Sequence, residues 1–217
     1  GGAGARGAGG MNAGSTMERV YLDLKAQIIA GTYPPGSRLD PFHLAKPLAA
    51  SATPVREALH RLAGERIIDS WHQEGFRQPI FAEADLCDLY AWGAALIDLL
   101  LHSKELPATL PEGALGEGGG GDYAARIARL FRAIALLGEN REFRYAIANL
   151  IERSQLMRAA ELRVDPHAAT VVELMEADFV HARWTELRRK NRHFHRRRIA
   201  LAHRVVAELR PRSQAIE

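Results

Sequence analysis

Apolar residues recur at helical spacing in three stretches near the start of the chain. The first follows the capping-box pattern Ser15–Glu18 and predicts a helix that ends at Gly31. The second predicts a short helix over about 41–48. The third begins at Thr53, and its apolar positions form a single stripe that a packed helix would bury.

This third helix is the most informative segment of the chain. Thr53 is placed to cap it, and Pro54 suits its first position because no backbone N–H is needed there. Arg56, His60 and Arg61 lie off the apolar stripe and are expected to point outward. A short helix with an apolar back and a basic front is suited to a DNA major groove.

After Gly64 the apolar period changes to that of strands. Residues 67–71 and 76–80 are predicted to be two strands joined as a hairpin. Three helices followed by a hairpin indicate a winged helix-turn-helix over residues 16–81. The glycine-rich residues 1–15 are expected to be a disordered tail or a cloning remnant.

From residue 82 the pattern is helical almost to the end of the chain. The glycine run 118–121 predicts a flexible loop, and Asp165 with Pro166 is expected to begin a helix. The predicted helices cover about 84–101, 123–137, 141–162, 166–176 and 178–209. The fold class is therefore mainly α, with an N-terminal winged helix-turn-helix and a C-terminal antiparallel α-helical bundle over 82–217.

Composition narrows the class of protein further. The net charge is only +3, so charge alone does not indicate a nucleic-acid partner. Cys87 is the single cysteine and cannot form an internal disulfide, which is typical of a reducing cytoplasm. No apolar run reaches the roughly 18 residues of a membrane span. A cytoplasmic protein without a membrane partner is expected.

Several segments of the N-terminal half occur in the order and spacing of a known family: Pro35–Leu39, Leu44–Ala45, Thr53–Leu59, Leu62 and Arg66–Ile68. They resemble the GntR family of bacterial transcription regulators, in its FadR-like branch. The helical half resembles that branch more weakly, through Arg129–Ile134, Gly138–Asn140, and His167 with Asp178. The resemblance implies homodimers, typically repressors, that bind double-stranded operator DNA. Their affinity for this DNA changes when a small metabolite, usually a carboxylic acid, binds in the helical domain.

The resemblance also implies DNA contacts from the third helix, which would be the recognition helix, and from segments before and after it. Arg38, at the start of the second helix, and Arg56 are suited to bidentate hydrogen bonds with phosphate or guanine. Ser51 and Thr53 can hold phosphate, and His60 and Arg61 extend the basic front. His72 and Gly75 would place the wing near the minor groove. For Arg56 and Arg61, the alternative is a solvated helix surface.

Ala52 departs from the family pattern, because an arginine often stands between the serine and the threonine of this motif. One base-reading contact is therefore expected to be missing, and the wing also carries the acidic Glu74. These two residues leave open a protein-interaction module that has lost sequence-specific DNA binding. An enzyme is not expected, because the chain has no nucleophile–base pattern and its glycine run lacks the residues of a P-loop.

Many relatives hold a divalent metal in the helical domain with one aspartate and three histidines. Here the corresponding positions are Ala128, Arg132, His167 and Arg189. One imidazole cannot hold a metal and arginines repel it, so no metal cofactor is expected. In a shifted register, His193 could supply a second imidazole.

The same substitutions suggest a different ligand chemistry. Arg132 and Arg189, with His167 nearby, could clamp an anionic effector directly. Alternatively, these arginines pair with an Asp or Glu, or turn outward. The basic run Arg188–Arg198 is similarly open to two interpretations, a second nucleic-acid surface or a solvated helix face.

Overall fold

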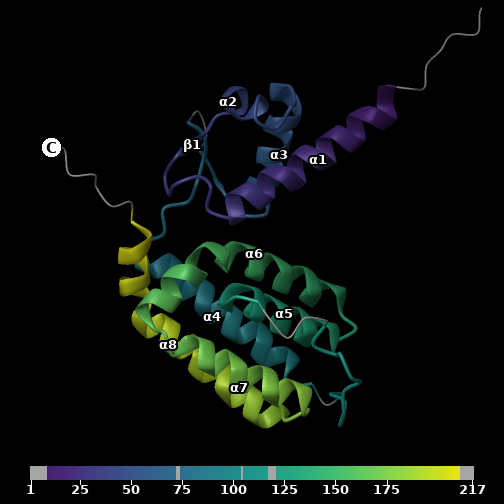
Figure 1. Cartoon of the computed structure of the whole chain (residues 1–217), viewed down its shortest axis with the longest axis vertical. Coiled ribbons are helices and arrows are strands. Elements are labelled where there is room, and N and C mark those ends of the chain that lie inside the picture. The colour runs from purple at the N-terminus through teal and green to yellow at the C-terminus, as the bar shows by residue number, and fades with distance from the viewer. Residues whose placement is uncertain (1–8, 72–73, 104, 117–120, 211–217) are drawn as a thin grey trace, which may run out of the picture. The chain divides into compact units, whose positions relative to one another are not determined.

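The computed structural model describes residues 9–71, 74–103, 105–116 and 121–210, with side chains from Gly14 onward. The chain divides after Ile80 into two compact units, Gly1–Ile80 and Phe81–Glu217 (Figure 1). The described part of the first unit contains three helices and three short strands: α1 Gly9–Ile29, β1 Arg38–Leu39, α2 Pro41–Ala45, α3 Ala52–Gly64, β2 Asp69–Trp71 and β3 Gly75–Arg77.

The three strands form one antiparallel sheet in the order β1-β3-β2. Leu39 of β1 lies opposite Phe76 of β3, and both are buried. Gly75 begins β3 with a φ of 83°, a left-handed conformation that glycine adopts without steric cost. The hairpin and the three helices confirm the predicted winged helix-turn-helix.

The core of the first unit lies mainly between α1 and α3. Val55, Leu59 and Leu62 of α3 are fully buried, as are Val20 and Leu24 of α1. The apolar stripe predicted for the recognition helix therefore forms its inner face. Burying such side chains stabilises the unit by about 1.5–3 kcal/mol each and fixes which side of α3 faces outward.

In the second unit the described residues form five helices: α4 Glu83–Leu100, α5 Tyr123–Leu136, α6 Arg141–Val164, α7 Ala168–Val180 and α8 Trp184–Leu209. Helix α4 packs most extensively against α8 and also contacts α5 and α6 (Figure 1). One hydrophobic cluster, centred on residues such as Phe131 and Phe194, runs through the unit. The mainly helical fold with a helical second domain is confirmed.

Several predicted boundaries at the N-terminal side are wrong. Helix α1 begins at Gly9, so residues 9–15 are not a disordered tail; residues 1–8 lie outside the described part. A nucleated helix extends readily where no proline interrupts it. Helix α3 begins at Ala52 with Ser51 as its N-cap, so Pro54 occupies the third helical position, where its missing N–H also has no intrahelical acceptor.

Two boundaries in the helical unit also differ from prediction. Asp165 ends α6 instead of starting the next helix, because the residue before a proline is driven out of the helical region. Asp178 lies inside α7, and α8 begins only at Trp184. The chain turns between these helices at Ala182, which has a φ of 52°.

Replacing Ala182 by glycine is expected to raise the free energy of unfolding by about 1 kcal/mol. A left-handed alanine is strained by its Cβ, whereas glycine is the usual residue after a helix end. The matched control is Ala200→Gly, at an exposed helical position, which should lower stability by about 0.5–1 kcal/mol. Urea unfolding of the unaltered chain and the two variants measures these opposite changes in the free energy of unfolding. Destabilisation by Ala182→Gly would contradict the prediction.

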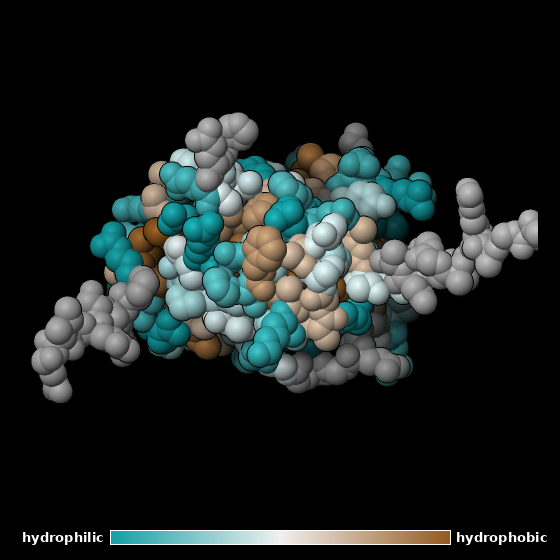
Figure 2. All heavy atoms as spheres, turned by 90° about the horizontal axis from the view of Figure 1, so that it is seen from above, coloured by the Kyte–Doolittle hydropathy of each residue, from teal (hydrophilic) through white to brown (hydrophobic). Residues whose placement is uncertain are grey.

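The surface seen in Figure 2 is largely hydrophilic, with hydrophobic residues in small separate groups. Among the described residues, no helix is at once long enough and apolar enough to cross a bilayer. Large hydrophobic side chains are exposed in both units, and one of them, Phe42, is 70% exposed.

Candidate nucleic-acid interface and polar centre of the helical domain

The N-terminal half of α3 presents its polar residues to solvent. Ser51, Thr53 and Arg56 are exposed. The Ser51 side chain makes no capping hydrogen bond, so its hydroxyl and the first N–H groups of α3 can donate to a phosphate. His60 is also exposed and packs edge-on against Phe76, with ring centroids 4.8 Å apart. These residues share the outer face that the buried stripe leaves free.

Arg38 and Gly75 lie in the sheet beside this helix. Arg38 is exposed in β1, not at the start of α2 as predicted, and its Cα lies opposite that of Arg77. Gly75 lies opposite Trp71 at the wing end of the hairpin. The predicted contact His72 lies outside the described residues. Arg38 therefore contributes positive charge from a strand.

Arg61 differs from the other predicted DNA contacts because it is engaged inside the first unit. Its guanidinium donates to Glu18 of α1 at 2.8 Å and lies 3.4 Å from Glu65. The same group lies 3.5 Å from the centroid of the Tyr21 ring. Arg61 thus faces α1 and joins α3 to it, so we do not place it in the interface.

Sequence reasoning missed Phe42, an exposed aromatic residue close to Arg56. The Arg56 guanidinium lies 5.8 Å from the centroid of the Phe42 ring. The sequence did contain a sign of this exposure. Leu44 and Leu48 are four residues apart and are buried on one side of α2 and the following turn, and Phe42 does not share their spacing.

In the helical unit, the predicted arginine clamp is not formed. Arg132, His167 and Arg189 are all exposed, and Arg189 pairs with Glu186 on its own helix at 2.7 Å. The stripe of α5 that includes Phe131 is buried, which turns Arg132 outward. The alternative reading, arginines that pair locally or turn outward, matches their positions.

The positions that hold a metal in relatives do not suit one here. Ala128 is buried but has no donor atom, and the other three positions face solvent, as does His193. Among the residues that the structure describes, no group of three or more His, Cys, Asp or Glu side chains could hold a metal ion. These residues therefore do not fit the metal that the family resemblance implies.

The basic run on α8 is largely paired with acidic residues. Arg188 and Arg192 both donate to Asp98 of α4, at 2.8 and 2.7 Å. The hydrogen bond from Arg188 lowers the pKa of Asp98 to about 2, against the effect of burial and with the help of Arg192. Lys190 similarly pairs with Asp178. These pairs favour a structural role for the run over a second nucleic-acid surface.

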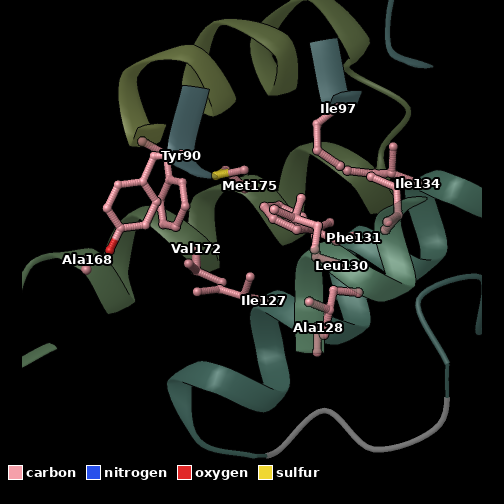
Figure 3. Close-up of a cluster of buried hydrophobic side chains, with 14 of the residues drawn as sticks. Tyr90, Ile97, Ile127, Ala128, Leu130, Phe131, Ile134, Ala168, Val172 and Met175 are labelled. Carbon is pink, nitrogen blue, oxygen red and sulfur yellow. The ribbon is translucent and has the colours of Figure 1, made fainter. Parts of the chain in front are cut away.

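Instead, a different set of polar side chains meets inside the helical unit. We call it the polar centre; its members are Tyr90, Tyr123, Arg158, Glu161 and Arg198. All five are buried. They come from α4, α5, α6 and α8, and Figure 3 shows Tyr90 beside the hydrophobic cluster built on α5 and α7.

Glu161 lies at the middle of the polar centre and accepts most of its hydrogen bonds. Tyr90 and Tyr123 donate to it at 2.8 and 2.9 Å, and Arg158 donates at 2.9 Å. Arg198 donates to the Tyr123 hydroxyl at 3.0 Å and lies 3.7 Å from the Glu161 carboxylate. Four helices are thereby joined through one carboxylate.

The polar centre carries more positive than negative charge. Burial tends to raise the pKa of Glu161, but Arg158 and Arg198 outweigh it and lower that pKa, so the carboxylate is ionised. Burial raises the pKa of Tyr90 and of Tyr123, so both phenols are neutral. Two guanidinium groups thus face one carboxylate. A buried excess charge is costly unless a counter-ion compensates it.

Two further buried polar residues adjoin this centre on α8. Asn191, His195 and Arg198 follow each other at the same helical spacing as Ser154, Arg158 and Glu161 on α6, so each set lies on one face. Among the described residues, the side-chain oxygen of Asn191 has no hydrogen-bond partner. His195 stacks on Phe131, with ring centroids 5.9 Å apart.

Stability is expected to fall between neutral pH and pH 5 because of His195. Burial lowers the pKa of His195 to about 4, with Arg158 and Arg198 acting in the same direction. The unfolded chain binds the proton near pH 6.5, so stability is complete above that pH and is lost as the pH falls toward 4. Between pH 7 and pH 5 the unaltered chain should lose unfolding free energy. This loss should be about 2 kcal/mol larger than the loss in His195→Gln. The exposed-site control His193→Gln should keep the full difference.

Comparison with known proteins gives matches to both parts of the chain. Residues 16–77 match the family described as "Bacterial regulatory proteins, gntR family". Over 72 residues the chain is 31% identical to the uncharacterized HTH-type transcriptional regulator YdhC of Bacillus subtilis (strain 168), covering 33% of this chain and 32% of that protein. Over 70 residues it is 34% identical to the HTH-type transcriptional repressor GlaR of Escherichia coli (strain K12), covering 32% of each. The matched segments span about a third of the length of these two relatives.

Solved structures resemble the chain over both units. A protein assigned as a GntR transcriptional regulator from Rhodococcus sp. RHA1 has a TM-score of 0.71 at 17% identity, with 87% of this chain and 98% of that chain covered. E. coli McbR/YncC has a TM-score of 0.54 at 22% identity, with 87% and 97% covered. At such identities the likeness concerns the fold. The exposed basic face of α3, the hairpin beside it and the match over residues 16–77 lead to one conclusion: the N-terminal domain is a winged helix-turn-helix similar to that of the gntR family of bacterial regulatory proteins.

Proposed function

We propose that the chain is a DNA-binding transcription regulator that acts as a homodimer. The observation that carries the proposal is the outer face of α3, where Arg56, Ser51 and Thr53 are exposed around a helix N-terminus. Such a face suits phosphate and base contacts in a major groove. A dimer would present two such helices to the two halves of an operator. The named regulators among its relatives support this proposal.

The proposal is tested by titrating the intact chain with genomic promoter fragments at increasing salt. A regulator should prefer some fragments, and its affinity should fall steeply as salt displaces its phosphate contacts. No preference among fragments at any salt concentration would favour the alternative, a protein-interaction module. Size determination with and without the bound fragment tests the dimer.

Within the same proposal, a small carboxylate binds at the polar centre and changes the affinity for operator DNA. The excess guanidinium charge of Arg158 and Arg198 is the supporting observation, because a carboxylate would balance it and pair with it by charge-assisted hydrogen bonds. In this proposal the anionic effector binds to side chains of α6 and α8 and not to the exposed Arg132, His167 and Arg189.

The test is thermal unfolding of the intact chain with a panel of mono- and dicarboxylates. A binding carboxylate should raise the melting temperature of the unaltered chain, because a ligand that binds only the folded state stabilises it. Arg198→Met should remove this rise, while the exposed-site variant Arg132→Met should keep it. A rise that survives Arg198→Met would overturn the assignment to the polar centre.

A further inference from the structure

Phe42 is an apolar side chain placed on the polar face of the first unit. It lies near the start of α2, where its backbone N–H donates to the Asp40 side chain at 2.8 Å. The ring is 70% exposed, although Leu44 on the same short helix is buried. An aromatic ring with so much area in water gains stability from being covered by apolar atoms. The folded unit itself does not cover it.

The surroundings of Phe42 identify which surface would cover it. Arg56 of α3 lies over its ring at 5.8 Å, so the ring is next to the exposed face that carries Ser51 and Thr53. Phe42 therefore lies within the surface that the proposed function assigns to DNA. Its occupant must be a nucleic-acid group, and an apolar one.

The DNA major groove offers one such group, the C5-methyl of thymine. Phenylalanine contacts this methyl, whereas guanidinium groups select guanine. Ala52, at the start of α3, supplies no long polar side chain for a competing base contact. The chain thus combines one cation, Arg56, with an aromatic ring beside it.

We infer that Phe42 is a specificity-determining residue that contacts the methyl group of a thymine in each operator half-site. This inference rests on the proposed function, because it requires α3 to enter the major groove. The Arg56 side chain holds the ring by a cation–π contact and contacts the neighbouring phosphate or base. Sequence preference at this position then comes from apolar contact.

The experiment begins with duplexes selected by the intact chain from a random pool. In the best duplex, each thymine is replaced in turn by deoxyuridine, which removes the methyl and keeps the base pair. The unaltered chain should bind about fourfold more weakly at one position per half-site, the fold-change that matches the roughly 0.8 kcal/mol of one buried methyl or methylene group.

Variants then assign the effect to Phe42. Phe42→Ala should bind the thymine and deoxyuridine duplexes equally at that position, and Phe42→Leu should keep part of the difference. Tyr145→Ala, which removes an exposed ring of the helical unit, should leave the difference unchanged. Because the Phe42 ring is exposed, its removal should preserve the fold, which thermal unfolding checks.

Two outcomes separate this inference from the proposed function. Specific binding that is indifferent to every thymine methyl, or a methyl effect that survives Phe42→Ala, overturns the role of Phe42 and leaves the regulator intact. Absence of any selected sequence overturns both. A methyl effect lost in Phe42→Ala and retained in Tyr145→Ala supports the inference.

Discussion

Replacing Glu161 by glutamine is expected to lower the free energy of unfolding by about 3–5 kcal/mol. Glu161 is the single carboxylate between the buried guanidinium groups of Arg158 and Arg198. Removing one partner of a buried ion pair leaves its charge uncompensated, which costs far more than the loss of an exposed pair. Urea unfolding of the full chain at neutral pH measures this loss.

The control for Glu161→Gln is Glu173→Gln, because Glu173 also pairs with an arginine but is 56% exposed. That variant should lose less than about 1 kcal/mol. Arg198→Met removes the excess cation instead of its counter-ion and should stay within about 1 kcal/mol of the unaltered chain. Equal losses in Glu161→Gln and Arg198→Met would show that charge balance does not govern the polar centre.

Replacing Arg56 by alanine is expected to weaken binding of a selected operator duplex by about 10- to 100-fold. This corresponds to the roughly 1–3 kcal/mol of a bidentate base contact, and Arg56 is exposed on the outer face of α3. Loss of a phosphate contact instead would also flatten the dependence of affinity on salt. Fluorescence anisotropy with a labelled duplex measures both quantities.

Arg61 provides the matched control on the same helix. Its guanidinium is held by Glu18 and the Tyr21 ring, so Arg61→Ala should change DNA affinity by less than about twofold at constant fold. A small loss of stability, under about 1 kcal/mol, is expected instead. Similar losses of affinity in both variants would mean that general positive charge, not the position of Arg56, determines binding.

The winged helix-turn-helix could be predicted because its local signals agree with its tertiary packing. Val55, Leu59 and Leu62 have the spacing of a helix and are buried together, which sends Arg56 outward. The exact start of α3 could not be predicted, since Ser51, Thr53 and Pro54 are all suited to a helix N-terminus. The face of a helix was therefore easier to predict than its ends.

The polar centre escaped prediction because its residues look like surface residues in the sequence. Arg198 ends the basic run of α8, and although it is four residues from the buried Phe194, its residue type is the same as that of the exposed Arg189. Its burial depends on Tyr123 and Glu161, far away along the chain. The break between α7 and α8 was misplaced for a similar reason, since Ala182 adopts a left-handed conformation without the glycine that usually marks one.

The hydrogen bond from Tyr90 to Glu161 has a consequence for communication along the chain. Tyr90 lies in the first half of α4, a helix that begins at Glu83, three residues after Ile80, the last residue of the N-terminal unit. Loss of this hydrogen bond would remove one contact that holds the N-terminal half of α4 to α6. The loss would therefore act about two helical turns from the residue at which α4 begins.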